Sequence, residues 1–222
     1  MEIEIKIKRQ VNSSSKPYFQ TFLYDGDGCM SVANWLRELN QSQLKDDPVY
    51  WQCGCMEKKC GACAMLVNGY PKLACCAFLK DVEKNGKIKL EPFRKFPLIK
   101  DLAVDRSVML DALKEMKIWL EEKKNIQNNL DLQTSVGECL ACGCCLEVCP
   151  NFISENKFIG AYAMVQAFKA LDQNERDEHV FEMKKEYSKQ FFNYCGQSFS
   201  CQNACPKNLS LDKIQARMNS KL

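Results

Sequence analysis

Cysteine is the residue that most constrains this chain, because fifteen of its 222 residues are cysteines and eleven of them fall into three groups of fixed spacing. A single histidine nearly excludes zinc sites built from two cysteines and two histidines. The first ten residues carry alternating charges without an apolar run, so we expect no export signal and no secreted disulfide framework. Thiols clustered in a reducing compartment instead indicate metal binding.

The remaining composition is that of an ordinary folded protein, with 46% hydrophobic and 27% charged residues. The formal net charge of +3 comes from charges spread along the chain. Proteins that bind nucleic acid concentrate Lys and Arg on one face, so we expect no nucleic-acid partner. No run of about 18 apolar residues occurs, and we therefore expect that the chain does not span a membrane by itself.

The first cysteine group has the spacing C-x4-C-x2-C-x11-C and consists of Cys55, Cys60, Cys63 and Cys75. This is the plant-type [2Fe–2S] spacing, in which a tight loop presents three thiolates and a later segment gives the fourth. Gly61 lets the backbone pass close to the cluster, and neighbouring amides can donate hydrogen bonds to the sulfurs. A structural zinc site is the weaker alternative, because four-cysteine zinc sites usually pair two C-x2-C knuckles.

The second group has the spacing of the bacterial ferredoxin run, C-x2-C-x2-C-x3-C-P. It consists of Cys139, Cys142, Cys145 and Cys149, followed by Pro150. In such a run three cysteines hold one cluster, and the cysteine before the proline holds the other. The sequence therefore predicts a pair of clusters in this part of the chain.

The third group repeats that run with its second cysteine missing. It consists of Cys195, Cys201 and Cys205, followed by Pro206, and Ser198 stands at the vacant place. We therefore expect one of the two clusters to have a cysteine ligand fewer than the other.

Crossed ligation between the second and third groups distributes the thiolates between the two clusters. The complete set, for a [4Fe–4S] cluster, is Cys139, Cys142, Cys145 and Cys205. The incomplete set is Cys149, Cys195 and Cys201. Three thiolates suit a [3Fe–4S] cluster, and a [4Fe–4S] cluster with Ser198 on its fourth iron is the alternative. We expect the other cysteines to be small buried packing residues: Cys29, Cys53, Cys76 and Cys144.

Hydrophobic periodicity divides the chain into a strand-rich first half and a helical second half. Strands are predicted at residues 2–9, 18–24, 64–67 and 87–91. Ser31 is the expected N-cap of a helix that ends near residue 39. Residues 92–97 read as a linker, and helices are predicted beyond it at residues 108–124, 158–171, 175–192 and 210–218.

This order of cysteine groups resembles the iron–sulfur subunit of the succinate dehydrogenase and fumarate reductase family. The resemblance covers almost the whole chain, and all eleven ligand positions match. Outside the cysteines it rests on Asn68-Gly69, residues 96–102, Val104-Asp105, residues 157–160 and Cys205-Pro206-Lys207.

The resemblance implies an α+β protein of two domains. Residues 1–100 are expected to form a β-grasp, plant-type ferredoxin domain, and residues 101–222 an all-helical, bacterial-ferredoxin-like dicluster domain. The chain would relay single electrons between FAD on a flavoprotein subunit and a quinone, with no catalytic residue of its own. It would be peripheral, on the cytoplasmic face of the inner (cell) membrane, held by a membrane-anchor partner.

Two departures from the family pattern bear on function. The first loop usually reads Cys-Arg-x-Gly-x-Cys, whereas this chain has Met56 and Lys58 at the Arg and Gly places. Lys58 and Lys59 add positive charge near the cluster, which would raise its reduction potential. A Trp and a His of ubiquinone-reducing relatives are replaced by Ser154 and Gly196, which favours menaquinone.

The residues expected near the quinone are Phe152, Ser198 and Lys207. Two other functions compete with this interpretation. The same electron relay could serve a flavoprotein with a different substrate or a non-quinone acceptor. A zinc-stabilised interaction module is the more remote alternative.

Overall fold

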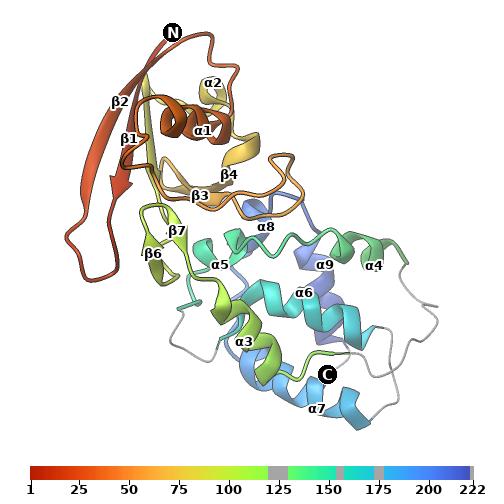
Figure 1. Ribbon diagram of the computed structural model, residues 1–222. Coiled ribbons are helices and arrows are strands. Elements are labelled where there is room, and N and C mark those ends of the chain that lie inside the picture. Colours follow the sequence, from red (N-terminus) through yellow and green to blue (C-terminus); the bar gives the residue numbers. More distant parts are fainter. Residues whose placement is uncertain (120–129, 154–157, 173–177, 221–222) are drawn as a thin grey trace. The chain divides into compact units, whose positions relative to one another are not determined.

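The computed structural model describes residues 1–119, 130–153, 158–172 and 178–220, and it divides the chain into two compact units (Figure 1). The first unit comprises residues 1–105 and the second comprises residues 106–222. Mixed strands and helices confirm the predicted α+β class, with the named strands in the first unit and the longer helices mainly in the second.

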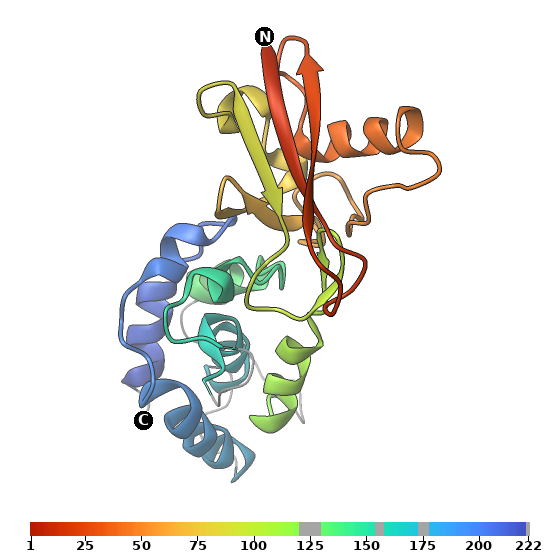
Figure 2. The ribbon, with the colours of Figure 1, turned by 90° about the vertical axis from the view of Figure 1, so that its left-hand side faces the viewer.

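The first unit is built on a five-stranded mixed sheet of order β2-β1-β5-β3-β4. Its strands are β1 (Glu2–Arg9), β2 (Tyr18–Asp25), β3 (Ala64–Val67), β4 (Tyr70–Leu73) and β5 (Lys87–Glu91). β1 pairs antiparallel with β2 and parallel with β5, so that Ile5 lies opposite both Phe22 and Ile88. The long β1–β2 pair is seen from a second direction in Figure 2. Ile3, Ile5 and Ile7 of β1 are fully buried, as their alternation predicts.

Helix α1 (Val32–Ser42) covers the core of this unit with Val32, Trp35, Leu36 and Leu39. The Ser31 hydroxyl accepts a hydrogen bond from the Asn34 amide, which confirms the predicted N-cap. The helix continues past the predicted end at residue 39. The strand β4, which follows the Asn68-Gly69 turn, was not predicted from the sequence.

Short elements complete the first unit. They are a 3₁₀ turn η1 (Ala74–Cys76), helix α2 (Leu79–Val82), and a separate hairpin of β6 (Leu98–Lys100) and β7 (Ala103–Val104). In the predicted linker, the rings of Phe93 and Phe96 are buried and lie 5.6 Å apart between centroids. This segment belongs to the first unit.

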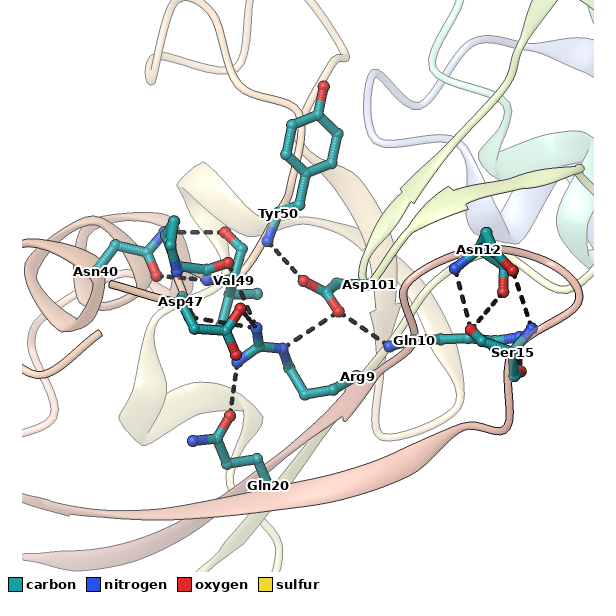
Figure 3. A network of polar contacts seen from close by, with 11 residues as sticks. Arg9, Gln10, Asn12, Ser15, Gln20, Asn40, Asp47, Val49, Tyr50 and Asp101 are labelled. Atoms are coloured by element: carbon teal, nitrogen blue, oxygen red, sulfur yellow. Dashed lines mark hydrogen bonds and ion pairs between the residues drawn. The ribbon is translucent and has the colours of Figure 1, made fainter. Parts of the chain in front are cut away.

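A buried ion pair joins β1 to the β6–β7 hairpin (Figure 3). The Arg9 Nε lies 3.2 Å from the Asp101 Oδ1, and both side chains are only 2% exposed. The Asp101 carboxylate also accepts hydrogen bonds from the backbone amides of Gln10 and Tyr50. The Arg9 guanidinium makes a second ion pair, of 3.0 Å, with the exposed Asp47. The network therefore fastens three distant segments of the first unit together.

The second unit is helical, and α6 (Gly160–Leu171) is its central element. Ten of the twelve residues of α6 are buried, and it packs against α3, α4, α5, α7 and α9. The surrounding elements are α3 (Ser107–Glu115), α4 (Leu130–Gly137), α5 (Cys144–Val148), α7 (Glu178–Tyr187), the π-helical η2 (Ser188–Phe192), α8 (Ser200–Ala204) and α9 (Leu211–Asn219).

Each predicted helix corresponds to one of these elements, but the bounds differ. The helix predicted at 108–124 is shorter in the structure, since α3 stops at Glu115. Residues 120–124 of that prediction lie outside the described residues. The prediction for 175–192 corresponds to α7 continued by η2, and residues 175–177 are likewise not described. Within the described parts of the chain, no helix combines the length and the apolar character needed to cross a membrane.

Candidate metal centres

The first cysteine group converges in the first unit. Cys55, Cys60 and Cys63 come from the loop before β3, and Cys75 comes from η1 after β4. The Cys55 amide donates a hydrogen bond to the Cys60 Sγ at 3.4 Å, and both Cys75 and Cys60 affect the pKa of Cys63. The structure thus brings together all four thiols of the plant-type spacing.

Backbone amides of the loop point at these sulfurs. The amides of Glu57 and Lys59 donate to the Cys55 Sγ at 3.3 and 3.2 Å, and the Lys58 amide donates to the Cys75 Sγ at 3.3 Å. Met56 and Lys58 have positive φ angles of 58° and 57°, which turn successive amides inward. Such a concave nest of amides stabilises an anion, and here the anion would be thiolate sulfur.

The electrostatics of this loop follow from the same contacts. Hydrogen bonds from the amides of Glu57 and Lys59 lower the pKa of the Cys55 thiol to about 7. Burial has the opposite effect on Cys63, whose pKa is raised to about 12. A cationic iron centre would hold both sulfurs as thiolates, because metal binding displaces the thiol protons.

The two lysines of the loop are not equivalent. The Lys59 Nζ forms an exposed ion pair of 2.8 Å with Glu57, which offsets its charge. The expected excess of positive charge near the cluster therefore comes mainly from Lys58. Lys58 occupies the left-handed conformation that explains a glycine at this place in the family pattern, since glycine adopts positive φ without strain.

Gly54 is a further determinant of this loop. A Cβ atom added at Gly54 would lie 3.1 Å from the Cys60 Sγ, so that alanine must displace the sulfur by a few tenths of an ångström. We expect Gly54→Ala to speed the loss of the [2Fe–2S] chromophore in the presence of a chelator. Gly137→Ala is the matched control, because nothing lies within 4 Å of its added Cβ. Equal rates in the two variants would contradict this role.

The second and third cysteine groups share left-handed positions and helix bounds at matching places. After Cys139, Ala141 and Gly143 have positive φ angles of 50° and 84°. After Cys195, Gln197 and Phe199 at the corresponding places both have a φ of 51°. Helices α5 and α8 then begin five residues after these cysteines, end at the same offset and pack against each other.

This repeat places Ser198 at the position of Cys142. A non-glycine residue with positive φ costs about 1 kcal/mol or more, and Ala141, Gln197 and Phe199 all bear this cost. The strain is retained at matching positions of the two runs. The structure thus supports the sequence alignment in which serine replaces the missing cysteine.

Two cavities in the second unit collect the cysteines in crossed sets. The residues lining the first cavity include Cys139, Cys142, Cys145 and Cys205. The residues lining the second include Cys149, Cys195, Cys201 and Ser198. Each cavity therefore takes its thiols from both runs, as the bacterial ferredoxin pattern predicts.

Burial controls the protonation of these thiols. It raises the pKa of Cys139, raises that of Cys145 well above its ordinary value, and raises that of Cys201 to about 11. A hydrogen bond from the thiol of Cys144 instead lowers the pKa of Cys142 to about 7. Buried thiols with raised pKa become good ligands only when a cation compensates their charge, so these cavities fit a metal–sulfide core. No three His, Cys, Asp or Glu side chains of the described residues are arranged to hold a single metal ion.

Comparison with known proteins agrees with these sites. Residues 4–111 match the model of a 2Fe-2S iron-sulfur cluster binding domain, and residues 133–209 match that of a 4Fe-4S dicluster domain. The chain is 32% identical over 242 residues to the succinate dehydrogenase iron-sulfur subunit of Bacillus subtilis, covering 98% of this chain and 91% of the relative. The chain belongs to the succinate dehydrogenase and fumarate reductase iron–sulfur subunit family.

Other members show similar coverage. The fumarate reductase iron-sulfur subunit of Wolinella succinogenes is 31% identical, over 94% of this chain and 91% of its own. A chain of the Mycobacterium smegmatis Sdh1 complex in the apo form has the same fold, with a TM-score of 0.79, 19% identity, and coverage of 99% and 96% of the two chains. As a member of this family, the chain is an electron-transfer subunit of an oxidoreductase complex, with a 2Fe-2S domain followed by a dicluster domain.

The three residues predicted near a quinone do not share one cavity. Ser198 lines the second cavity, whereas Lys207 lines the first and lies 3.6 Å from the Glu138 carboxylate. Phe152 lines neither of these cavities and is buried close to Gly160. Gly196 lines the second cavity, and Ser154 lies outside the described residues.

The prediction for the four remaining cysteines was wrong for three of them. Cys29, Cys53 and Cys76 are exposed, and only Cys144 is buried. Cys29 and Cys53 lie in loops and Cys76 ends the 3₁₀ turn η1, where no periodic pattern indicates burial. Sequence reasoning also missed Gln215, whose side chain lines the second cavity. The sequence feature that could have identified Gln215 is its place among the apolar residues on one face of the last helix.

Proposed function

We propose that this protein relays single electrons between FAD on a flavoprotein subunit and a quinone, in a succinate dehydrogenase or fumarate reductase complex. The proposed [2Fe–2S] domain is residues 1–100, and the proposed dicluster domain is residues 101–222. The observation that carries the proposal is the collection of the cysteines of two separate runs into two crossed sets.

The thiols of the first loop and of the two cavities support three sets of proposed ligands. The [2Fe–2S] ligands are Cys55, Cys60, Cys63 and Cys75. The [4Fe–4S] ligands are Cys139, Cys142, Cys145 and Cys205. The [3Fe–4S] ligands are Cys149, Cys195 and Cys201. A serine-ligated fourth iron at Ser198 is the alternative form of the third cluster, and the Ser198 Oγ already accepts a hydrogen bond from the Ser200 Oγ at 3.3 Å.

When bound, iron–sulfur clusters supply one-electron redox chemistry, and their potentials depend on ligands, hydrogen bonds to sulfur and burial. The chain itself contributes the thiol sets, the inward-pointing amides of the first loop and the apolar walls of the two cavities. None of these groups makes or breaks a bond of a substrate. The dicarboxylate chemistry would belong to the flavoprotein partner.

We further propose that the quinone is menaquinone and that a membrane-anchor subunit holds this chain on the cytoplasmic face of the cell membrane. The absence of the Trp and His of ubiquinone-reducing relatives from the sequence supports menaquinone. The loop around Ser198 and Gly196, which lines the second cavity, is the candidate contact with the quinone. Phe152 and Lys207 remain candidates on sequence grounds.

The proposal is tested on the complex purified anaerobically with its native partners. We expect succinate to bleach the visible absorbance of the clusters, fumarate to restore it, and a reduced menaquinone analogue to bleach it again. Two results would support the alternative in which the same relay serves another substrate or acceptor. In one, succinate does not reduce the clusters and fumarate does not reoxidise them. In the other, the complex exchanges electrons only with soluble acceptors.

A further inference from the structure

Gln215 is a buried carboxamide in a helix face that is otherwise apolar. It lies on α9, where Leu211, Ile214 and Met218 form the buried stripe, and it belongs to the same stripe with an exposure of 6%. Burying a side-chain amide without a hydrogen-bond partner is unfavourable, whereas a leucine at this place would continue the stripe. The amide therefore needs a partner in the interior of the unit.

That partner is a cysteine sulfur. The Gln215 Nε2 lies 3.4 Å from the Cys195 Sγ, within the range of an N–H···S hydrogen bond. Both residues line the second cavity, together with Cys149 and Cys201. The nitrogen of the carboxamide must face the sulfur, because a thiolate is an acceptor only and the amide oxygen cannot donate.

The side-chain donors that line the first cavity are of other kinds, the Tyr162 phenol and the Lys207 ammonium group. Cys139 corresponds to Cys195 in the repeated run, yet among the described residues that line the first cavity none is Gln or Asn. The two cysteine runs repeat the same backbone features, but only the second cavity has the carboxamide of Gln215 beside its cysteines.

We propose that Gln215 raises the reduction potential of the cluster held by Cys149, Cys195 and Cys201, through a hydrogen bond from its Nε2 to the Cys195 sulfur. This inference rests on the proposed function, since it requires a cluster in the second cavity. Gln215 is a positioning residue that acts through Cys195.

The sign follows from charge. Reduction adds an electron to the cluster and its thiolates, so a donor to sulfur stabilises the reduced state more than the oxidised state. Loss of the donor lowers the potential. Because a carboxamide does not titrate, the shift is expected to be the same across the pH range in which the protein is folded.

The test is a redox titration of the full chain, with any partners that copurify, followed by low-temperature EPR. Gln215→Met keeps the length of the side chain and removes the donor, and Gln215→Leu is a second variant that matches the apolar stripe. We expect both to lower the midpoint potential of the cluster in the second cavity and to leave that of the [4Fe–4S] cluster unchanged. Gln166→Met, on α6, is the matched control because Gln166 lines neither described cavity.

A second readout detects the hydrogen bond directly. After exchange into D₂O, electron–nuclear double resonance on wild-type protein should show an exchangeable deuteron coupled to this cluster. That coupling should be lost in Gln215→Met and retained in Gln166→Met. A merely structural role for Gln215 would not produce this selective loss.

The outcomes separate the two proposals. If wild-type protein carries no third cluster, the proposed function itself fails. If the third cluster is present and its potential and deuteron coupling are unchanged in both Gln215 variants, only this inference fails. Failure of both variants to assemble the third cluster, with the others intact, would also contradict it, because Gln215 would then be needed for assembly and not for tuning.

Discussion

Replacing Cys205 by alanine is expected to abolish the [4Fe–4S] cluster, although Cys205 belongs to the third cysteine run. The reason is geometric, because Cys205 lines the first cavity with Cys139, Cys142 and Cys145. Alanine leaves this set one thiolate short, and the raised pKa values of Cys139 and Cys145 favour protonation of these two thiols without a metal. Low-temperature EPR of the dithionite-reduced protein measures the loss.

Cys149→Ala is the substitution in the second run that corresponds to Cys205→Ala in the third. Cys149 precedes a proline as Cys205 does, but it lines the second cavity with Cys195 and Cys201. We expect this variant to lose the [3Fe–4S] signal of the oxidised protein. Uncrossed ligation predicts the reverse pattern, with Cys205→Ala removing the cluster of the third run and Cys149→Ala that of the second. Observation of the reverse pattern would overturn the ligand sets.

Asp101→Asn is expected to reduce the free energy of unfolding of the first unit by about 3 to 5 kcal/mol, the cost of removing one partner of a buried ion pair. The substitution keeps the shape of the side chain and removes the charge that faces the buried Arg9 guanidinium (Figure 3). Asparagine also tolerates the positive φ of 47° at this position. Hydrogen exchange of the β1 and β2 amides, read by mass spectrometry, reports on this unit separately.

Asp47→Asn is the control, because it removes a carboxylate from the same guanidinium. The Asp47 side chain is 64% exposed, so its ion pair with Arg9 should contribute at most about 1 kcal/mol. The two ion-pair distances are similar, 3.0 and 3.2 Å, so the contrast comes from the burial of Asp101 and from the two backbone amides that it accepts. Equal losses for the two variants would show that the Arg9–Asp101 pair is not the buried anchor of the hairpin.

The cysteines that line each of the two cavities could be grouped from the sequence, because the spacing of a ferredoxin run relates residues of two separate segments. Counting residues gives Ser198 the same position in the third run that Cys142 has in the second. The two runs also have left-handed residues at matching positions in the structure. Those positions could not have been predicted, since Gln197 and Phe199 are residue types that rarely adopt positive φ. Only the closure of the chain around a cavity explains why they do.

The strands and helices were predictable where one face is buried. Ile3, Ile5 and Ile7 alternate with charges, and β1 follows. Strand β4 was missed because Pro71 interrupts a segment of only four residues, and proline usually argues against a strand. The ion pair of Arg9 with Asp101 was also missed, because it joins residues far apart in the sequence and no local pattern marks either of them.

The sequence did not predict the contact of a single polar residue in an apolar stripe. It also did not predict the exposure of cysteines outside the three groups. Gln215 was absorbed into a helix pattern, although it contacts the sulfur of Cys195. Cys29 and Cys53 were assigned to the interior because cysteine is often buried, yet both are exposed. Average burial of a residue type does not replace a periodic pattern around it.

The eleven grouped thiols are expected to hold three iron–sulfur clusters. The most direct measurement is low-temperature EPR of the anaerobically purified protein, as isolated and after dithionite, together with analysis of metal and acid-labile sulfide. We predict a brown protein with iron and sulfide, a three-iron signal when oxidised, and separate [2Fe–2S] and [4Fe–4S] signals when reduced. A colourless protein that contains zinc and no sulfide would contradict the claim.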